Sequence, residues 1–207
     1  RRYMLERGIP VDDALVVCVP VSIRTGTEKQ RWANYVHMIF APLPTDLDDP
    51  IARVRAAGAA VKAAKGSFDA MPVGLIREAA QFIPSALFTT MTRLMVKLPD
   101  AVSKGPWNVV VSNVRGPSRA AYMDGVRVKG YWPASFLSVG GGINITLQSY
   151  ADRICFGVMG APEQVGDLRP FIGHLEAALA EVVAAVEASA SEQPAPRTRR
   201  ATASRPD

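Results

Sequence analysis

The chain has 207 residues and a net charge of +5, with 48% apolar and 21% charged residues. These values are typical of one globular domain with a substantial core. No apolar run approaches the roughly 18 residues that cross a bilayer, and the chain shows no internal repeat or metal-ligand cluster. Basic residues are not interleaved with aromatic ones in a stripe, which argues against nucleic-acid binding. The mild positive balance suits an anionic ligand or an anionic membrane surface.

The first elements are predicted to be a helix end and a buried strand. Residues 1–8 have the pattern of a final helical turn that closes at Gly8, so we expect the helix to begin before the first residue. Residues 14–23 are nearly all apolar, which is typical of a strand buried on both faces. Cys18 and Cys155 both lie inside apolar strand patterns. We therefore expect them to be buried and reduced rather than nucleophilic, in a cytoplasmic protein.

Residues 32–43 are predicted to form a second strand with two apolar faces. Asn34 shares one face with Val36, Met38 and Phe40, and His37 lies on the other. We interpret His37 as a core histidine, because no acidic residue adjoins it. Asn34 either lines a site or caps a turn.

Helices are expected between residues 48 and 98. Asp48-Asp49-Pro50 is a helix start, and the predicted buried stripe of this helix is Ile51, Val54, Gly58 and Val61. Residues 72–98 are strongly apolar and are interrupted by Pro84, which predicts two hinged helices. They form either a core pair or an apolar surface that lines a tunnel or lies in a membrane interface.

The segment from Pro106 to Pro117 predicts a short buried strand that ends in polar residues. Three valines, 109–111, precede Ser112 and Asn113, and Gly116-Pro117 ends the run. A rigid strand end is a good place for a binding or reacting group. The alternative is that Ser112 and Asn113 only begin the turn.

The last third of the chain predicts a hairpin, a strand pair and a long helix. Asp124-Gly125 indicates a tight hairpin turn. Residues 143–150 alternate between an apolar face and a polar face that either sees water or lines a cavity, and the chain turns back at Ala151-Asp152. The final helix is predicted from about Asp167, with His174 in a structural role. Residues 189–207 are expected to be a disordered tail that follows a single domain over 1–188. The apolar stripe of the final helix comprises Leu168, Ile172, Leu175, Leu179, Val182 and Val186.

The order of these elements predicts an α/β fold, with a mixed sheet, flanking helices and at least one antiparallel strand pair. Four stretches in this order resemble the bacterial wax ester synthase/diacylglycerol acyltransferase family. The resemblance covers the chain from its start to about Val186, and it includes three departures from the family pattern, at Ala33, Arg115 and Ala151. The stretches are Val19-Pro20-Val21-Ser22-Ile23-Arg24, Asn34 to Leu43-Pro44-Thr45-Asp46, Val109 to Pro117, and Gly140-Gly141-Gly142-Ile143-Asn144-Ile145 with Ser149-Tyr150 and Phe156-Gly157.

The catalytic signature of that family, H-H-x-x-x-D-G, is absent from this sequence. In the family it lies in the N-terminal half, so the resemblance implies that this chain is the C-terminal half. The implied fold is one half of a chloramphenicol acetyltransferase-like two-domain fold. In that fold, two halves enclose a channel, and acyl-CoA and acceptor enter it from opposite ends.

The implied activity is acyl transfer from acyl-CoA, a substrate rather than a cofactor, to diacylglycerol or a long-chain alcohol. Such a reaction needs a base for the hydroxyl proton and donors for the oxyanion. By resemblance, Ser112 is the favoured oxyanion donor, with Asn113 in support. The expected partners are the N-terminal half, both substrates and a membrane surface, and the expected location is peripheral to membrane or lipid droplets. The resemblance implies that Asn34, Gly116, Asn144, Gln148 and Tyr150 bind substrate.

Two other functions remain open at this point. One is a non-catalytic module of the same fold that binds lipid or a partner chain. The other is half of a peptide-synthetase condensation domain, which shares the architecture. The Ser-Asn stretch at 112–113 and the Ser-Tyr stretch at 149–150 favour the acyltransferase. An H-H-x-x-x-D-G motif encoded in frame upstream of Arg1 would separate the acyltransferase from the non-catalytic module.

Overall fold

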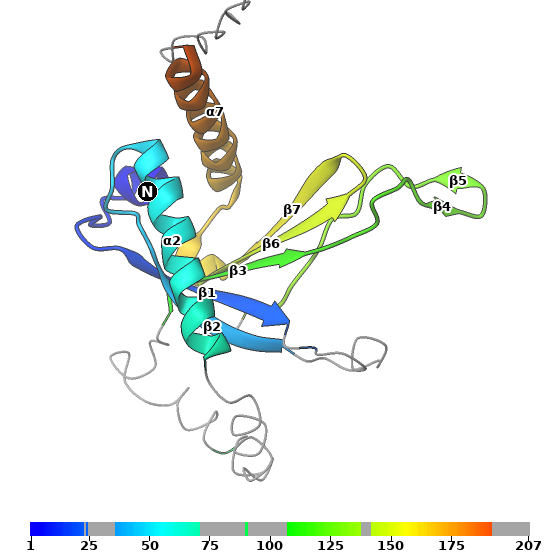
Figure 1. Cartoon of the computed structure of the whole chain (residues 1–207), viewed down its shortest axis with the longest axis horizontal. Helices are drawn as coiled ribbons and strands as arrows, with labels where there is room; N and C mark the ends of the chain where they lie inside the picture. Colours follow the sequence, from blue (N-terminus) through cyan, green and yellow to red (C-terminus); the bar gives the residue numbers. More distant parts are fainter. Residues whose placement is uncertain (23, 25–35, 71–89, 91–106, 138–141, 192–207) are drawn as a thin grey trace, which may run out of the picture.

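A computed structural model describes the chain except for residues 23, 25–35, 71–89, 91–106, 138–141 and 192–207. Its strands form a five-stranded sheet in the order β2-β1-β3-β6-β7, and a separate hairpin of β4 and β5 projects from the sheet (Figure 1). In chain order the elements are α1 (Arg2–Glu6), β1 (Leu15–Ser22), β2 (Val36–Leu43), α2 (Pro50–Asp69), β3 (Val109–Val114), β4 (Tyr122–Met123), β5 (Val126–Arg127), β6 (Ile143–Tyr150), β7 (Arg153–Gly160), α6 (Pro162–Val165) and α7 (Arg169–Ser191).

The sheet is mixed, as the sequence predicts. β1 pairs antiparallel with β2 and parallel with β3, whereas β6 pairs parallel with β3 and antiparallel with β7. Two parallel strands need a long connection between them. The connection from β3 to β6 carries the β4–β5 hairpin, whose turn has Asp124 at φ 49° and Gly125 at φ 77°. Positive φ at both positions is the reason for the Asp-Gly sequence.

Helix α2 covers one face of the sheet and forms the main core with it (Figure 1). The helix begins where predicted, and the Asp49 side chain accepts a hydrogen bond from the Ala52 backbone N–H. The predicted stripe was partly wrong, because Val54 and Gly58 are exposed. Instead, Ala60 and Ala64 of α2 pack against the core together with Val61. Small alanine side chains allow the helix to approach the sheet closely. The core consists of Val17, Ala41 and Val109, with Val19, Leu43, Ala60, Val61, Ala64, Val111, Ile143 and Ile145 packed against it.

Strand β6 has the alternation that the sequence predicts, and its polar face is the buried one. Asn144, Thr146, Gln148 and Tyr150 are each less than 8% exposed. They are covered by the connection between β3 and β6, since the Tyr150 hydroxyl donates to the Val128 carbonyl and accepts from the Ala121 N–H. Buried polar side chains of this kind must find partners, and the connection supplies them.

Helices α1 and α7 lie at one end of the molecule. Helix α1 ends at Glu6, two residues before Gly8, which has φ 64°. Helix α7 continues to Ser191, so that residues 189–191 are helical rather than part of a tail. His174 on α7 is 2.9 Å from a Glu6 carboxylate oxygen and links the two helices. The predicted stripe of α7 is only partly covered, because Leu179 is 65% exposed.

Three predictions concern residues outside the described part of the chain. They are the placement of Asn34, the hinged helices of 72–98 (where only Thr90 is described) and the tail from residue 192. Within the described residues, no helix is long and apolar enough to cross a membrane.

Candidate functional site

The strand register sorts the side chains of the sheet onto two faces. Val17 pairs with Ala41 and Val109, and all three belong to the core under α2. The next residue along β1, Cys18, points to the opposite face, together with Phe40 and Val110. No helix among the described residues packs on this second face.

A cavity of about 440 Å³ lies on this second face, a volume within the range of small-molecule sites. It is built by β1, β2, β3 and β6 and by the part of the connection that returns to β6. Most of its wall is apolar. The lining residues are Cys18, Pro20, Val36, Met38, Phe40, Trp107, Val110, Ser112, Ser135, Phe136 and Asn144.

The apolar side of the cavity is open to solvent. Val36, Met38 and Phe40 alternate along the edge strand β2 and are each 41–43% exposed. Phe40 stacks on Trp107, with ring centroids 5.5 Å apart. The sequence correctly predicts that these three β2 residues share a face. An exposed row of apolar side chains of this kind indicates a surface that binds an apolar group.

The polar side of the cavity carries two hydroxyls and one amide. Ser112 reaches it from β3, Asn144 from β6 and Ser135 from the returning connection. Asn144 is 4% exposed, and its side-chain nitrogen donates to the Phe136 carbonyl at 3.0 Å and to the Ser135 hydroxyl at 3.3 Å. Its oxygen accepts from the Thr146 hydroxyl at 2.9 Å. The sequence does not single out Ser135, because no motif or periodicity marks it.

Cys18 forms part of the wall as a neutral group. It is 3% exposed, and burial raises the pKa of its thiol. A raised pKa keeps the thiol protonated at neutral pH, so Cys18 is a poor nucleophile there. Both cysteines are free and buried, as the sequence predicts.

The structure brings Ser112 and Asn144 to the cavity and places the other predicted residues that it describes elsewhere. Asn113 is exposed on the α2 side of β3. Gly116 donates its backbone N–H to the Ser149 hydroxyl at 3.0 Å, and a side chain at this position would collide with the Ser149 carbonyl and with Gln148. Together with Tyr150, this contact fixes the start of the connection to β6. None of Gly116, Gln148 and Tyr150 lines the cavity. Gln148 and Tyr150 lie further along the same face of β6 under the connection, and Gly116 lies at the start of the connection.

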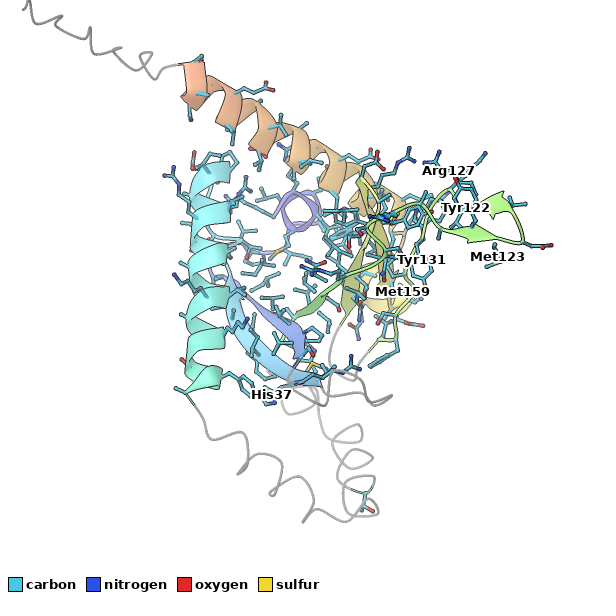
Figure 2. All side chains as sticks on the ribbon, turned by 45° about the vertical axis from the view of Figure 1, so that its right-hand side comes forward. His37, Tyr122, Met123, Arg127, Tyr131 and Met159 are labelled. Atoms are coloured by element: carbon cyan, nitrogen blue, oxygen red, sulfur yellow. The ribbon has the colours of Figure 1, made fainter. Side chains whose placement is uncertain are left out.

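His37 lies on the α2 side of β2 and not in the cavity. Its ring stacks on Phe68 near the end of α2, with centroids 4.1 Å apart (Figure 2). This position agrees with a packing role. In the described part of the chain, no three His, Cys, Asp or Glu side chains are placed to bind a metal ion.

Helix α2 covers one face of the sheet, and the apolar cavity lies on the second face, which we call the open face. This two-layer α/β arrangement is the architecture of one half of a chloramphenicol acetyltransferase-like fold. The family model named WS/DGAT C-terminal domain matches residues 32–182, which is most of the chain. The chain therefore belongs to the C-terminal domain family of the wax ester synthases/diacylglycerol acyltransferases.

Individual relatives agree with this assignment. A Mycobacterium tuberculosis protein named as a diacylglycerol O-acyltransferase is 33% identical over 188 residues, which are 90% of this chain and 40% of the relative. A Mycobacterium bovis protein of the same name is 29% identical over 188 residues, with the same coverage. The solved wax ester synthase/diacylglycerol acyltransferase of Marinobacter aquaeolei superposes with a TM-score of 0.66 at 27% identity, over 87% of this chain and 39% of that one. The chain thus spans about 40% of the length of these proteins.

Proposed function

We propose that this chain is the C-terminal part of an acyl-CoA-dependent O-acyltransferase. Its products are triacylglycerol or wax esters, made from diacylglycerol or a long-chain alcohol. The names of the relatives support the acyltransferase class, and one observation carries the proposal to this chain. That observation is the apolar cavity on the open face of the sheet, with hydroxyl groups at one side of it.

One wall of the cavity carries groups that an acyl-transfer site requires. Val36, Met38 and Phe40 offer an apolar surface to an alkyl chain. Ser112 offers a hydroxyl donor on a rigid strand end, where it stabilises the oxyanion that forms when the alcohol attacks the thioester. Acyl-CoA is a substrate in this scheme, and no cofactor takes part.

The base that accepts the alcohol proton comes from outside this chain. The H-H-x-x-x-D-G signature is absent here, and in the family it lies in the N-terminal half. That half closes over the open face and completes the channel, which explains why apolar residues are exposed there. The assembled enzyme works at the surface of a membrane or lipid droplet, where its lipid substrates are found.

The test compares the 207-residue chain with the complete protein encoded by its reading frame. Hexadecanoyl-CoA is supplied with diacylglycerol in one assay and with hexadecanol in another. We expect turnover by the complete protein and none by the isolated chain, because the isolated chain lacks the base. Turnover by the chain alone would refute the proposal that the catalytic base lies outside this chain. A complete protein that binds the lipids but turns over neither pair would support the non-catalytic lipid-binding module instead.

A further inference from the structure

We propose that Ser135 is a second hydroxyl donor to the carbonyl oxygen of the bound acyl group, and that Asn144 is the residue that positions it. This inference rests on the proposed function, since it assumes that the cavity takes an acyl group. It adds a residue that lies outside every sequence motif. The structural basis is the partly buried hydrogen-bond cluster at the cavity wall, formed by Ser135, Phe136, Asn144 and Thr146.

The orientation of the Asn144 amide follows from its neighbours. The Phe136 carbonyl can only accept a hydrogen bond, so the side-chain nitrogen of Asn144, 3.0 Å away, must face it. The amide oxygen then faces the Thr146 hydroxyl, which donates to it. The second N–H of the same nitrogen points to the Ser135 oxygen, 3.3 Å away. The backbone of the connection thus fixes the amide, and the amide fixes the serine.

This arrangement decides which way the Ser135 proton points. A serine hydroxyl has one proton to donate and two lone pairs that accept. Because one lone pair accepts from Asn144, the proton is left for another acceptor. Among the described residues, the Ser135 hydroxyl makes no other hydrogen bond, and its side chain lines the cavity. The hydroxyl proton of Ser135 is therefore free to be donated to a ligand in the cavity.

Ser112 contributes a hydroxyl to the same cavity from the neighbouring strand. In the register of β3 and β6, Ser112 pairs with Thr146, which adjoins Asn144 in the cluster. The two serines therefore frame the polar side of a largely apolar cavity. A hydroxyl in such a place loses free energy unless it finds a partner. One carbonyl oxygen has two lone pairs and can accept from both serines.

The test uses the 207-residue chain and a probe that needs no catalysis. The probe is 2-decanone with a ¹³C-labelled carbonyl, whose infrared stretching band moves to lower frequency when the oxygen accepts a hydrogen bond. We expect the band of the bound ketone to lie at lower frequency in the wild type than in Ser135→Ala. We also expect Ser135→Ala to bind the ketone about fivefold more weakly, the effect of one neutral hydrogen bond. Ser135→Thr keeps the hydroxyl and should restore both values.

Ser118→Ala is the matched control, because Ser118 is an exposed serine on the same connection and should leave the band unchanged. Asn144→Asp tests the positioning role. A carboxylate accepts the Ser135 proton, so the band should move to that of Ser135→Ala although the serine is present. If Asn144→Asp melts far below the wild type, the serine variants alone decide the outcome. The inference fails if the ketone does not bind, or if Ser135→Ala leaves the band of the bound ketone where it is in the wild type. It fails for Asn144 if a folded Asn144→Asp variant keeps the wild-type band.

The infrared result is independent of turnover. A complete protein with no acyltransferase activity would refute the proposed function while leaving the Ser135 band shift intact. Active protein with no band shift would refute the inference alone.

Discussion

The two faces of the five-stranded sheet differ in what covers them. On one face, α2 seals a core of valines, alanines and isoleucines in which Val17 and Ala41 are 2–3% exposed. On the other face, the β3–β6 connection covers the polar side chains of β6, and the apolar row of β2 stays open. Neighbouring residues of a strand belong to different faces, so Ile39 is 4% exposed while Phe40 is 43% exposed.

This difference suggests that the α2 face maintains the fold and that the open face performs the function. Burial of apolar surface is the main source of stability, and it is concentrated under α2. The open face keeps apolar surface in contact with water, which costs free energy. An exposed apolar surface of this kind marks a place where a ligand or partner binds and removes that contact with water. The predictions below test this separation, beginning with the largest expected effect.

The first prediction is that Ser112→Ala in the complete protein lowers kcat by about 10²–10³-fold with little change in KM for acyl-CoA. The reason is that an oxyanion donor acts mainly in the transition state. Steady-state kinetics and thermal melting on the same preparation test it. A packing role would give the opposite result, with a melting temperature that falls and a turnover per folded molecule that does not.

The second prediction compares two neighbours on β2. Ile39→Ala should lower the free energy of unfolding by about 2–5 kcal/mol, because it opens a cavity under α2. Phe40→Ala removes a larger side chain but should cost less than half as much, since Phe40 is 43% exposed whereas Ile39 is 4% exposed. Chemical denaturation of both variants measures the difference. Equal losses for the two variants would show that the open face also carries the fold.

The third prediction concerns the part of the open face that the connection covers. Tyr150→Phe removes a hydroxyl that donates to the Val128 carbonyl and accepts from the Ala121 N–H. We expect a loss of about 1–3 kcal/mol and faster amide hydrogen exchange in residues 121–128. Tyr122→Phe is the control, because Tyr122 is 65% exposed on the hairpin (Figure 2). If both variants exchange at the wild-type rate, Tyr150 does not hold the connection.

The smallest expected effect lies away from both faces, at the start of α7. The side chain and backbone N–H of Arg169 donate to the Asp167 carboxylate and lower its pKa. A carboxyl whose pKa is lower in the folded state stabilises the fold above its unfolded pKa, and the effect disappears as the pH falls through the folded pKa. Asp167→Asn should therefore melt slightly below the wild type at neutral pH and equal to it in strong acid. A difference that is the same at every pH would exclude this linkage.

The sequence predicts the elements better than it predicts their surroundings. The alternation in residues 143–150 locates β6 to the residue, because period two is a property of the strand alone. It does not reveal that Asn144 and Gln148 are on the buried side, since the cover comes from the β3–β6 connection. In α2, alanines pack where the pattern favours larger residues, and Val54 is exposed. Ser135 belongs to no regular element, so only the fold brings it beside Asn144 and into the cavity with Ser112.

The central claim is that the open face of the sheet binds the acyl group. Methyl-labelled methionines test it, because Met38 lies in the cavity, Met4 is buried near α7 and Met123 is exposed on the hairpin. Octanoyl-CoA is titrated into the 207-residue chain, and the methyl resonances are assigned by Met→Leu substitution. The account predicts that the Met38 resonance moves saturably while those of Met4 and Met123 stay in place. A Met38 resonance that stays in place while octanoyl-CoA binds would contradict it.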